Sequence, residues 1–359
     1  MKKIMIAAAG TGGHIFPGIA IAKGVDPLRE EVIWVGTSQG MENKWVPAAG
    51  LRLATIPMTG LRGKGLLRLL KAPYLLWQSV RAAKALIQKE SPNLIIGMGG
   101  YVSAPMGIAA KLSGIPLLIH EQNAVQGSAN RLLSLWATHI FESFPETFKP
   151  SSKLTCSGSP VRQAILDAAS LKSSQASEAS LNVLVLGGSQ GAMAINTVMP
   201  EVMALLAEKT PVLFWHQTGE KSFAVIESLY REKKMTPYCL SPFIADMAQA
   251  YLWADLIICR AGAMTVAEVS TMGVPAIFIP APQAIDDHQT ANAKRLVNAG
   301  AALYLPQSAL SPDALVKLIR HFAEHRQALS ELSLAAETFS SAHRDAVSHI
   351  MTVARRVMG

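Results

Sequence analysis

Short apolar runs rich in β-branched residues alternate along the chain with longer stretches in which apolar residues recur at helical spacing. This alternation is typical of parallel βαβ units, in which helices cover both faces of a buried sheet. The pattern predicts two series of strands. The first series lies at 3–8, 32–35, 94–97, 117–120 and 139–142, and the second at 182–186, 212–216, 256–259, 276–279 and 302–305.

Both series open with a strand that runs directly into a glycine-rich turn. The first turn is Gly10-Thr11-Gly12-Gly13, and the second covers 187–191. This repeat of architecture predicts two Rossmann-like halves. A polar, serine-rich stretch at 170–180 has the composition of a linker, so the boundary between the halves is expected near 160–180.

The overall composition is that of a compact protein with room for two domains. The chain has 359 residues, of which half are apolar and 16% are charged, and this excludes a disordered protein. The mean hydropathy of +0.26 leaves contact with lipid open. The net charge of +8 is unevenly spread, because residues 43–89 hold nine basic residues and no acidic one. One surface is therefore expected to bind anions.

The sequence predicts no membrane span, disulfide framework or cysteine zinc site. Its apolar start resembles a signal peptide but leads directly into the first glycine turn, so we interpret it as a buried strand. The longest uncharged stretch, 94–110, is interrupted by glycines and a proline. The three cysteines lie far apart, which fits a reducing cytosol.

A glycine turn between a strand and a helix lets the backbone approach a phosphate, which N–H groups and the positive helix end then hold. Neither turn has the lysine of a P-loop, so an ATPase or GTPase is not expected. The second strand of each half also ends without the acid that binds ribose in nicotinamide enzymes, at Gly36-Thr37 and at His216-Gln217. The glycines alone favour a phosphate site and a structural turn equally.

A third glycine turn follows the predicted strand at 256–259. Glu268 falls in the first turns of the next helix, where its carboxylate could accept hydrogen bonds from a ribose diol. The N–H groups of 262–265 would then face a phosphate. A glutamate that only complements the helix dipole is an equally good interpretation.

A polar cluster, Asp286-Asp287-His288-Gln289 followed by Asn292, has side chains suited to sugar hydroxyls. A loop that enters a capped helix is the alternative. The chain contains no Asp-x-Asp, and two adjacent aspartates seldom bind a metal ion alone, so no metal is expected.

Three further polar segments follow predicted strands of the first half: His14, 99–103 and 120–123. The carboxyl ends of parallel strands line the ligand crevice of doubly wound sheets. A lone histidine is more often structural than catalytic, but the convergence of three segments favours a site here.

Leucines and cations are mixed within 65–89. We expect Pro73 to begin a second helix there, with Gln78, Arg81, Lys84 and Gln88 on its polar face. The short piece before it has more leucines than one buried face needs, and leucines among cations suit an anionic membrane surface. The residues expected at the membrane are Leu66, Leu67, Arg68, Leu69, Leu70, Lys71 and Trp77.

Six ordered motifs of this chain resemble those of the bacterial N-acetylglucosaminyltransferases that convert lipid I to lipid II in peptidoglycan synthesis. The motifs are residues 10–18, 59–65, 99–103, 120–123, 187–192 and 260–263. The resemblance runs nearly end to end and implies an α/β GT-B fold, with two Rossmann-like domains that face each other across a cleft. It implies an acceptor- and membrane-binding domain at 1–162, onto which a C-terminal helix at about 342–359 packs back, and a UDP-N-acetylglucosamine-binding domain at 163–341.

The same resemblance implies the residues of both substrate sites. Ile244 would meet the uracil, Glu268 the ribose, Ser189 and Arg162 the diphosphate, and Gln289 and Asn292 the sugar. The whole expected donor site is Thr11, Gly12, Gly13, Asn123, Arg162, Ser189, Ile244, Ala263, Met264, Thr265, Glu268, His288, Gln289 and Asn292. The expected acceptor site is Tyr101, His120, Glu121 and Asn123.

The implied reaction is an inverting transfer in which the muramyl 4-hydroxyl displaces UDP. His14 is the expected general base and Glu121 the alternative. Helix N-termini and Arg162 would stabilise the leaving diphosphate without a metal or cofactor. The expected substrates are UDP-N-acetylglucosamine and lipid I. The protein would bind peripherally to the anionic cytoplasmic face of the cell membrane. Cell-wall or division proteins are expected as further partners, and nucleic acid is not.

Three alternatives stay open at this point. A glycolipid synthase and a UDP-N-acetylglucosamine epimerase would share the fold, although an epimerase has no need of the basic leucine segment. A non-catalytic nucleotide-sugar sensor docked on the membrane is the alternative from another functional class.

Overall fold

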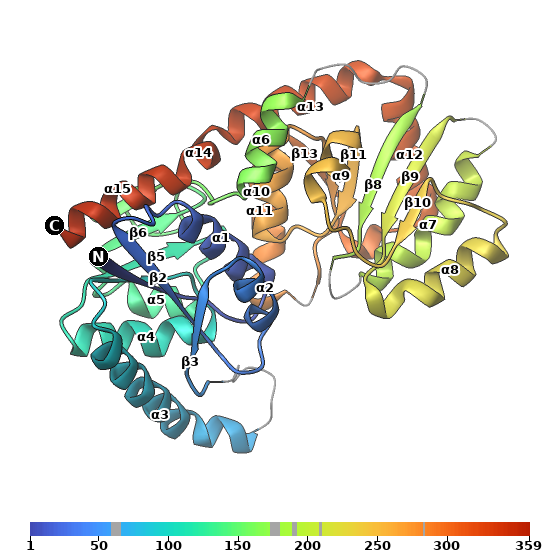
Figure 1. The fold of residues 1–359 in the computed structure, drawn as a ribbon. Coiled ribbons are helices and arrows are strands. Elements are labelled where there is room, and N and C mark those ends of the chain that lie inside the picture. Colours follow the sequence, from blue (N-terminus) through green and yellow to red (C-terminus); the bar gives the residue numbers. More distant parts are fainter. Residues whose placement is uncertain (59–65, 173–179, 189–191, 208–209, 283) are drawn as a thin grey trace. The chain divides into compact units, whose positions relative to one another are not determined.

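The computed structural model describes the chain except residues 59–65, 173–179, 189–191, 208–209 and 283, and only the backbone of 66–71 and 285. It divides into two compact units, Met1–Arg162 with Ala342–Gly359, and Gln163–Ser341 (Figure 1). Each unit is a parallel sheet with helices on both faces. The α/β class and the two Rossmann-like halves predicted from the sequence are confirmed.

Seven parallel strands form the sheet of the first unit in the part that the structure describes, in the order β3-β2-β1-β4-β5-β6-β7. The order reverses beside the central strand β1, between it and β4, which is the switch point where doubly wound sheets bind ligands. The strands are β1 (Lys2–Ala7), β2 (Glu30–Gly36), β3 (Arg52–Thr55), β4 (Leu94–Gly97), β5 (Leu117–Glu121), β6 (His139–Glu142) and β7 (Leu154–Cys156).

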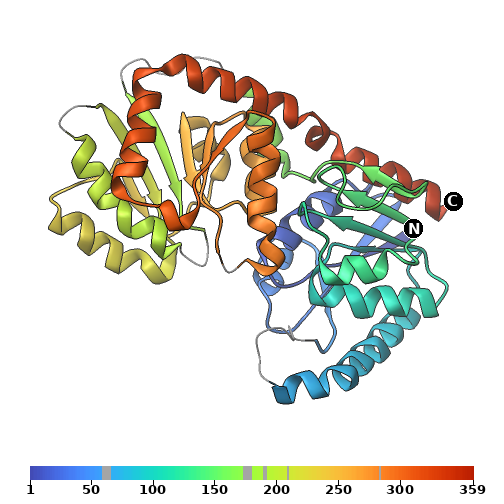
Figure 2. The ribbon, with the colours of Figure 1, turned by 180° about the vertical axis from the view of Figure 1, so that it is seen from behind.

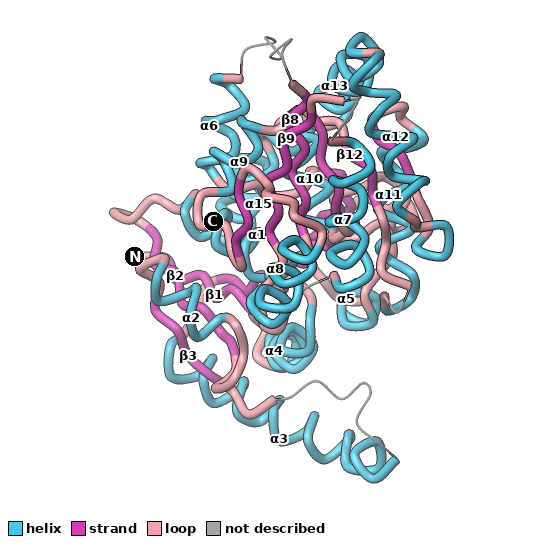
Figure 3. Tube along the Cα trace, turned by 90° about the vertical axis from the view of Figure 1, so that its right-hand side faces the viewer, coloured by secondary structure: helices cyan, strands magenta, loops and turns pink. Residues whose placement is uncertain are grey.

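Helices cover both faces of this sheet because successive side chains of each buried strand point to opposite sides. Met5 and Ile33 pack toward one face with α3 (Leu66–Glu90), α4 (Gly100–Leu112) and α5 (Ser128–Leu133). Ile4 and Trp34 pack toward the other face with α1 (Gly12–Lys23), α2 (Glu42–Ala48) and α15 (Ala346–Met358). Helix α3 packs beside α4, and its first turns project beyond the sheet (Figures 1 and 3).

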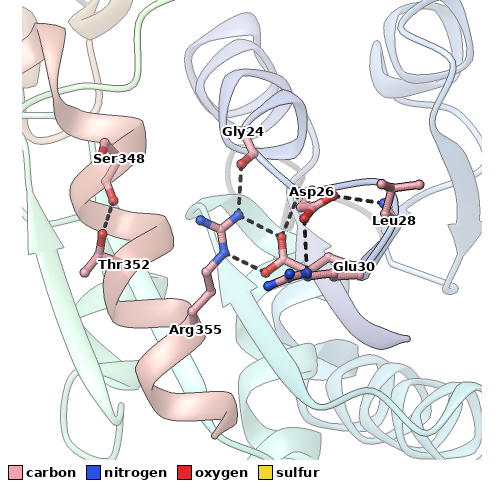
Figure 4. A network of polar contacts seen from close by, with 8 residues as sticks. Gly24, Asp26, Leu28, Glu30, Ser348, Thr352 and Arg355 are labelled. Carbon is pink, nitrogen blue, oxygen red and sulfur yellow. Dashed lines mark hydrogen bonds and ion pairs between the residues drawn. The ribbon is translucent and has the colours of Figure 1, made fainter.

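The last helix, α15, completes the core of the first unit. Ile350, Met351 and Ala354 are buried in the same cluster as β1 and α1. Arg355 forms a bidentate ion pair with Glu30 at the start of β2, with N–O distances of 2.9 and 3.0 Å (Figure 4). The C-terminal end of the chain is thereby fixed to the sheet that its N-terminal end begins.

The second unit repeats this plan with a six-stranded parallel sheet, counted over its described residues, in the order β10-β9-β8-β11-β12-β13. Helices α7 and α12 lie side by side on one face (Figures 1 and 2), and α6, α9, α10, α11 and α13 complete the cover. The strands are β8 (Leu181–Leu186), β9 (Val212–Gln217), β10 (Cys239–Ser241), β11 (Leu256–Cys259), β12 (Ala276–Phe278) and β13 (Ala302–Tyr304). The helices are α6 (Gln163–Leu171), α7 (Met193–Leu206), α8 (Phe223–Glu232), α9 (Met247–Trp253), α10 (Ala263–Thr271), α11 (His288–Asn298), α12 (Pro312–Glu324) and α13 (Arg326–Phe339).

All ten predicted strands are present, and three others were missed. The missed strands, β3, β7 and β10, are edge strands of three or four residues. Their side chains are only partly buried, so they carry too few apolar residues for a strand pattern to stand out.

The prediction that Pro73 begins a new helix is wrong. Helix α3 runs unbroken from Leu66 to Glu90 with Pro73 inside it. The missing hydrogen bond of an internal proline costs about 3 kcal/mol. The part of α3 after Pro73 remains helical because Ala83 and Ile87 are buried against the sheet and α4. Three residues of the expected polar face of this helix, Arg81, Lys84 and Gln88, are exposed, and the fourth, Gln78, is half-buried.

Candidate active site

The first glycine turn joins β1 to α1 and is held by two side chains from elsewhere in the first unit. Gly10 has a φ of +103°, which favours glycine. A Cβ at this position would lie 3.2 Å from the Tyr101 ring. The Gly10 N–H donates to the Glu42 carboxylate over 3.3 Å. The turn is therefore fitted between Tyr101 and Glu42, and Glu42 is a residue that the motifs did not indicate.

His14 lies in the first turn of α1, and its ring sits over the glycine pair that follows β4. A Cβ on Gly99 would lie 3.1 Å from the His14 Cδ2 atom and 3.2 Å from Nε2. Gly99 and Gly100 both have positive φ, at +89° and +74°. A side chain at Gly99 would displace the ring, so the glycine pair makes room for His14. The structure thus brings together two of the three polar segments predicted for this half.

The third polar segment, residues 120–123, contains Glu121, whose carboxylate is held by four hydrogen bonds. Its Oε1 accepts hydrogen bonds from the N–H and the side-chain amide of Asn123, both over 3.1 Å. Its Oε2 accepts from the Gly127 N–H and from Asn130 Nδ2, both over 2.9 Å. A carboxylate has about four lone-pair sites, and here each has a donor. Glu121 is thus held as a fixed acceptor, and taking up a proton would cost it one of these bonds.

Asn130 lies between this carboxylate and the Gly99 turn. It is fully buried, and besides Glu121 its amide donates to the backbone carbonyl of His120 over 2.9 Å. A Cβ on Gly99 would lie 3.4 Å from the same amide nitrogen. Asn130 stands outside the motif at 120–123, and nothing in the sequence pattern distinguished it from a helix residue.

His120, which was predicted to contact the acceptor, lies inside the unit. This side chain has no exposed surface, and its Nε2 donates to the Gly158 carbonyl over 3.0 Å. The Gln122 amide donates to Nδ1 over 3.0 Å. Burial lowers the pKa of His120 to about 4, so the ring is neutral at pH 7. His120 braces the end of β5 from inside the unit.

The remaining predicted residues of the first unit are accessible. Tyr101 and Asn123 are half-buried, and Thr11 is exposed at the turn. Arg162 places its guanidinium 5.1 Å from the centre of the Phe16 ring in α1. Burial raises the pKa of the Tyr101 phenol; the Thr37 side chain lowers it in part, and the nearby Glu42 charge raises it.

In the second unit, the glycine turn after β8 is held by Gln217, the last residue of β9. Gln217 Oε1 accepts from the Gly188 N–H over 3.0 Å, and its amide donates to the Pro242 carbonyl over 3.0 Å. Gly187 has no room for a side chain, because a Cβ would lie 2.8 Å from Asn196 Oδ1. Ser189, predicted to hold the diphosphate, lies outside the described residues.

Glu268 lies in α10 and is almost completely buried. Its Oε2 accepts a hydrogen bond from the Tyr251 hydroxyl over 3.1 Å. Tyr251 lies in α9, is 1% exposed, and was not predicted. Its phenol fixes one carboxylate oxygen of the residue predicted to bind the ribose.

Two side chains hold the turn that leads into α10. Arg260 donates to the carbonyls of Ile279 and Pro280, both over 2.9 Å, and to Gln307 over 2.6 Å. Asn292 is fully buried and donates to the Ala261 carbonyl over 3.1 Å. Asn292, which was predicted to contact the sugar, braces this turn, and no part of its side chain reaches the surface.

The other predicted donor residues range from buried to partly exposed. Ile244, Ala263 and Met264 are buried, whereas Thr265, His288 and Gln289 are half-buried. Gln289 accepts from the Ala281 N–H over 2.9 Å, which leaves its amide N–H groups for other partners. Asp286 and Asp287 both have φ near +50°, so they form a tight turn before α11.

The predicted membrane segment is described only in part, because the side chains of 66–71 lie outside the described residues. Further along α3, Tyr74 and Trp77 are 58% and 56% exposed and stack with ring centres 6.1 Å apart. The Arg81 guanidinium lies 5.7 Å from the centre of the Trp77 ring. An aromatic pair beside a cation is therefore exposed on this helix.

Over the described part of the chain, no helix is long and apolar enough to cross a membrane. Within the same residues, no group of three or more histidine, cysteine, aspartate or glutamate side chains lies close enough to hold a metal ion.

Known families account for nearly the whole chain. Residues 4–142 match the N-terminal domain of glycosyltransferase family 28, and residues 182–350 match its C-terminal domain. A protein of Methylococcus capsulatus named "UDP-N-acetylglucosamine--N-acetylmuramyl-(pentapeptide) pyrophosphoryl-undecaprenol N-acetylglucosamine transferase" is 44% identical over 94% of each chain. The crystal structure of Acinetobacter baumannii MurG is 38% identical, has a TM-score of 0.82, and aligns over 99% of this chain and all of the other. The chain belongs to the MurG family.

MurG relatives match end to end. A protein of Ectopseudomonas mendocina with the same name as the Methylococcus protein is 43% identical over 99% of this chain and 98% of its own. The GT-B fold expected from the resemblance is thereby established for both units.

More distant structures share only the fold. One is a putative UDP-N-acetylglucosamine 2-epimerase of Listeria monocytogenes, with a TM-score of 0.69 but 12% identity. The MurG family is therefore distinguished from the epimerases by its sequence, because their backbones are alike.

Proposed function

We propose that this protein transfers N-acetylglucosamine from UDP-N-acetylglucosamine to the 4-hydroxyl of the muramyl residue of lipid I, giving lipid II. The observation that carries the proposal is the 44% identity, over 94% of both chains, with an enzyme named for this transfer. The geometry supports it, since each unit ends its central strand in a braced glycine turn with polar residues beside it.

The donor site is assigned to the second unit. The Glu268 carboxylate accepts the ribose diol, and the N–H groups at the start of α10 face the diphosphate. Gln289 offers its amide to the sugar, and Ile244 packs on the uracil. Ser189 adds a hydrogen bond to the diphosphate.

The chemical step is assigned to the first unit. The acceptor oxygen attacks the anomeric carbon, the bond from that carbon to the UDP oxygen breaks, and its electron pair leaves with the diphosphate. His14 takes the hydroxyl proton. The structure favours His14 over Glu121 for this role, because all four lone-pair sites of Glu121 already accept hydrogen bonds.

A direct assay tests the activity and its proposed independence of metal ions. Purified protein with UDP-N-acetylglucosamine and a lipid I analogue is expected to form the lipid II analogue at the same rate with and without EDTA. Helix N-termini supply the positive potential that the leaving diphosphate needs. Product is followed by mass spectrometry. Donor consumption without acceptor would indicate an epimerase or hydrolase, and loss of activity in EDTA that only a divalent ion restores would contradict the metal-free mechanism.

Removing the Glu268 carboxylate is expected to weaken donor binding. Glu268→Ala should cost about 1 to 3 kcal/mol, because two ribose hydroxyls lose a charged acceptor. Tyr251→Phe should cost less, since it removes only the bond that orients the carboxylate. Calorimetry with UDP and 2′-deoxy-UDP checks the assignment: both variants should lose more affinity for UDP than for the deoxy analogue. Equal losses for the two ligands would place Glu268 away from the ribose.

Peripheral binding to the cytoplasmic face of the cell membrane is assigned to α3. Replacing Trp77 by Ser and Arg81 by Glu should weaken binding to vesicles that contain anionic lipid, because an interfacial aromatic residue and an attractive charge are lost. The matched control is Tyr238→Ser, an aromatic residue of the second unit that is 60% exposed. Sedimentation at low and high salt measures the effect. Equal binding by the α3 variant and the control would exclude this helix as the membrane surface.

A further inference from the structure

Arg260 belongs to the motif at 260–263, yet the proposed function gives its side chain no part in the donor site. It directly follows β11 and is half-buried. Its Nη1 donates to the carbonyls of Ile279 and Pro280, both over 2.9 Å, and its Nη2 donates to Gln307 Oε1 over 2.6 Å. Ile279 and Pro280 directly follow β12, and Gln307 lies shortly after β13. One side chain therefore ties together the carboxyl ends of three neighbouring strands.

The segment after β12 that Arg260 holds also carries the partner of Gln289. The N–H of Ala281 donates to Gln289 Oε1 over 2.9 Å. A backbone N–H only donates, so the amide atom that meets it is the oxygen, and the NH2 group of the amide is directed away from Ala281. Among the residues that the structure describes, this NH2 group has no hydrogen-bond partner. The side chain of Gln289 is thus fixed as a hydrogen-bond donor toward a ligand.

The first turns of α11 are held from a second side by Asn292. Its amide donates to the Ala261 carbonyl over 3.1 Å, and residues three apart share one face of a helix. On this face of α11, Asn292 contacts the turn after β11, and Gln289 contacts the segment after β12. Arg260 joins the same two segments directly. The place of the Gln289 amide therefore depends on the bonds that Arg260 makes.

We propose that Arg260 and Gln307 are positioning residues for the donor sugar, which hold the segment after β12 so that the Gln289 NH2 group donates to an oxygen atom of N-acetylglucosamine. This inference rests on the proposed function, because it takes the donor sugar to be the ligand of Gln289. It adds a direction to that contact, since a glutamine amide without a fixed partner can turn over and accept instead.

An electrostatic role for Arg260 is the alternative. All three of its acceptors are neutral, and among the described residues no carboxylate lies within ion-pair distance of it. Its charge lies just before α10, whose N-terminal end is itself positive. Such a charge would favour the diphosphate, which UDP and UDP-N-acetylglucosamine share. Positioning of Gln289 would favour only the ligand that carries the sugar, so the ratio of the two dissociation constants separates the two roles.

The test measures by calorimetry the dissociation constants for UDP-N-acetylglucosamine and for UDP, without acceptor. Arg260→Lys keeps the charge but loses the planar fork that spans several acceptors. R260K should weaken binding of UDP-N-acetylglucosamine about 3- to 10-fold, the range for one lost neutral hydrogen bond, and leave that of UDP within about twofold.

Arg326→Lys is the matched control for the loss of an arginine fork. Arg326 is also half-buried in the second unit, but it pairs with Asp255 over 3.6 Å. Asp255 directly precedes β11, so this pair lies at the opposite edge of the sheet from Arg260. R326K should leave the ratio of the two dissociation constants unchanged, even where it lowers stability.

A double-mutant cycle checks that Arg260 acts through Gln289. Gln289→Leu should change the ratio by a factor similar to that of R260K, and the double variant should differ from Q289L by less than about twofold. Gln307→Leu should act in the same direction as R260K. Gln307→Glu, which keeps an acceptor oxygen for Arg260, should retain the ratio of the wild type. A merely structural role of these residues would change the affinity for both ligands together.

The outcomes separate this inference from the proposed function. If the ratio shifts as expected but no sugar reaches lipid I, the proposed transfer fails and the inference stands. If the wild type binds both ligands but R260K and Q307L leave the ratio unchanged, or if the effects of R260K and Q289L add, the inference is wrong and the proposed function stands. Wild-type protein that binds neither ligand would refute both.

If R260K does not fold, the two Gln307 variants decide. A changed ratio in Q307L that Q307E restores would support the inference. An unchanged ratio in Q307L, or one that Q307E fails to restore, would overturn it.

Discussion

Replacing His14 by alanine is expected to lower kcat by about 100-fold or more and to leave affinity for UDP-N-acetylglucosamine nearly unchanged. A general base contributes about 10² to 10⁴ in rate, and this ring sits at the start of α1 over the Gly99-Gly100 turn that precedes Tyr101. Single-turnover kinetics measure the chemical step, and calorimetry measures donor binding.

A purely structural His14 predicts a different result. The glycine pair leaves a space for the ring, so its loss would then lower the melting temperature and change the rate little. His349→Ala, an exposed histidine of α15, controls for removing an imidazole anywhere in the protein. If a folded His14→Ala variant has normal turnover, the role of general base is assigned to Glu121 instead, in spite of its four hydrogen bonds.

Mild acid is expected to destabilise the first unit through two buried histidines. Burial lowers the pKa of both His120 and His343 to about 4, and the nearby His120 ring lowers that of His343 further. The hydrogen bonds of both rings also require the neutral form. His343 Nδ1 accepts from the Ser159 N–H over 2.9 Å, and His120 Nδ1 accepts from Gln122, so a proton on either atom would face a donor.

The direction of this pH effect on stability follows from the difference in histidine pKa between the folded and the unfolded chain. An unfolded histidine takes up its proton near pH 6.5, whereas these rings resist it until about pH 4 in the folded protein. The unfolded state therefore binds more protons throughout this interval, and stability falls as the pH drops through it. Between pH 7.5 and 5 the loss should be about 2 kcal/mol for each histidine.

Urea unfolding at pH 7.5 and at pH 5 measures this loss. His120→Gln keeps a donor for Gly158, and His343→Asn keeps an acceptor for Ser159, so each variant should lose part of the pH dependence without losing its bond. His325→Gln, an exposed histidine at the end of α12, should retain the full dependence. A pH response in the double variant equal to that of the wild type would contradict the prediction.

The sequence by itself determined the class of fold and the family. Ten strands were predictable because buried parallel strands are short, continuous apolar runs, and that signal is local. The glycine turns, Glu268 and His14 could be proposed as site residues because their positions relative to those strands carry chemical meaning. The edge strands and the unbroken helix through Pro73 were missed, since pairing at a sheet edge and packing on α4 are not written in a local pattern.

Only the tertiary structure decided which polar side chains reach the surface and which are buried against the backbone. Histidine and asparagine are common at protein surfaces, yet His120 and Asn292 are both fully buried and donate to backbone carbonyls. Tyr251 and Glu42 stand in unremarkable positions of the sequence, yet each contacts a proposed site across the fold. The physical reason is that a buried polar group must find its partner in space, and the partner lies 17 residues away for Glu268 and 32 for Gly10.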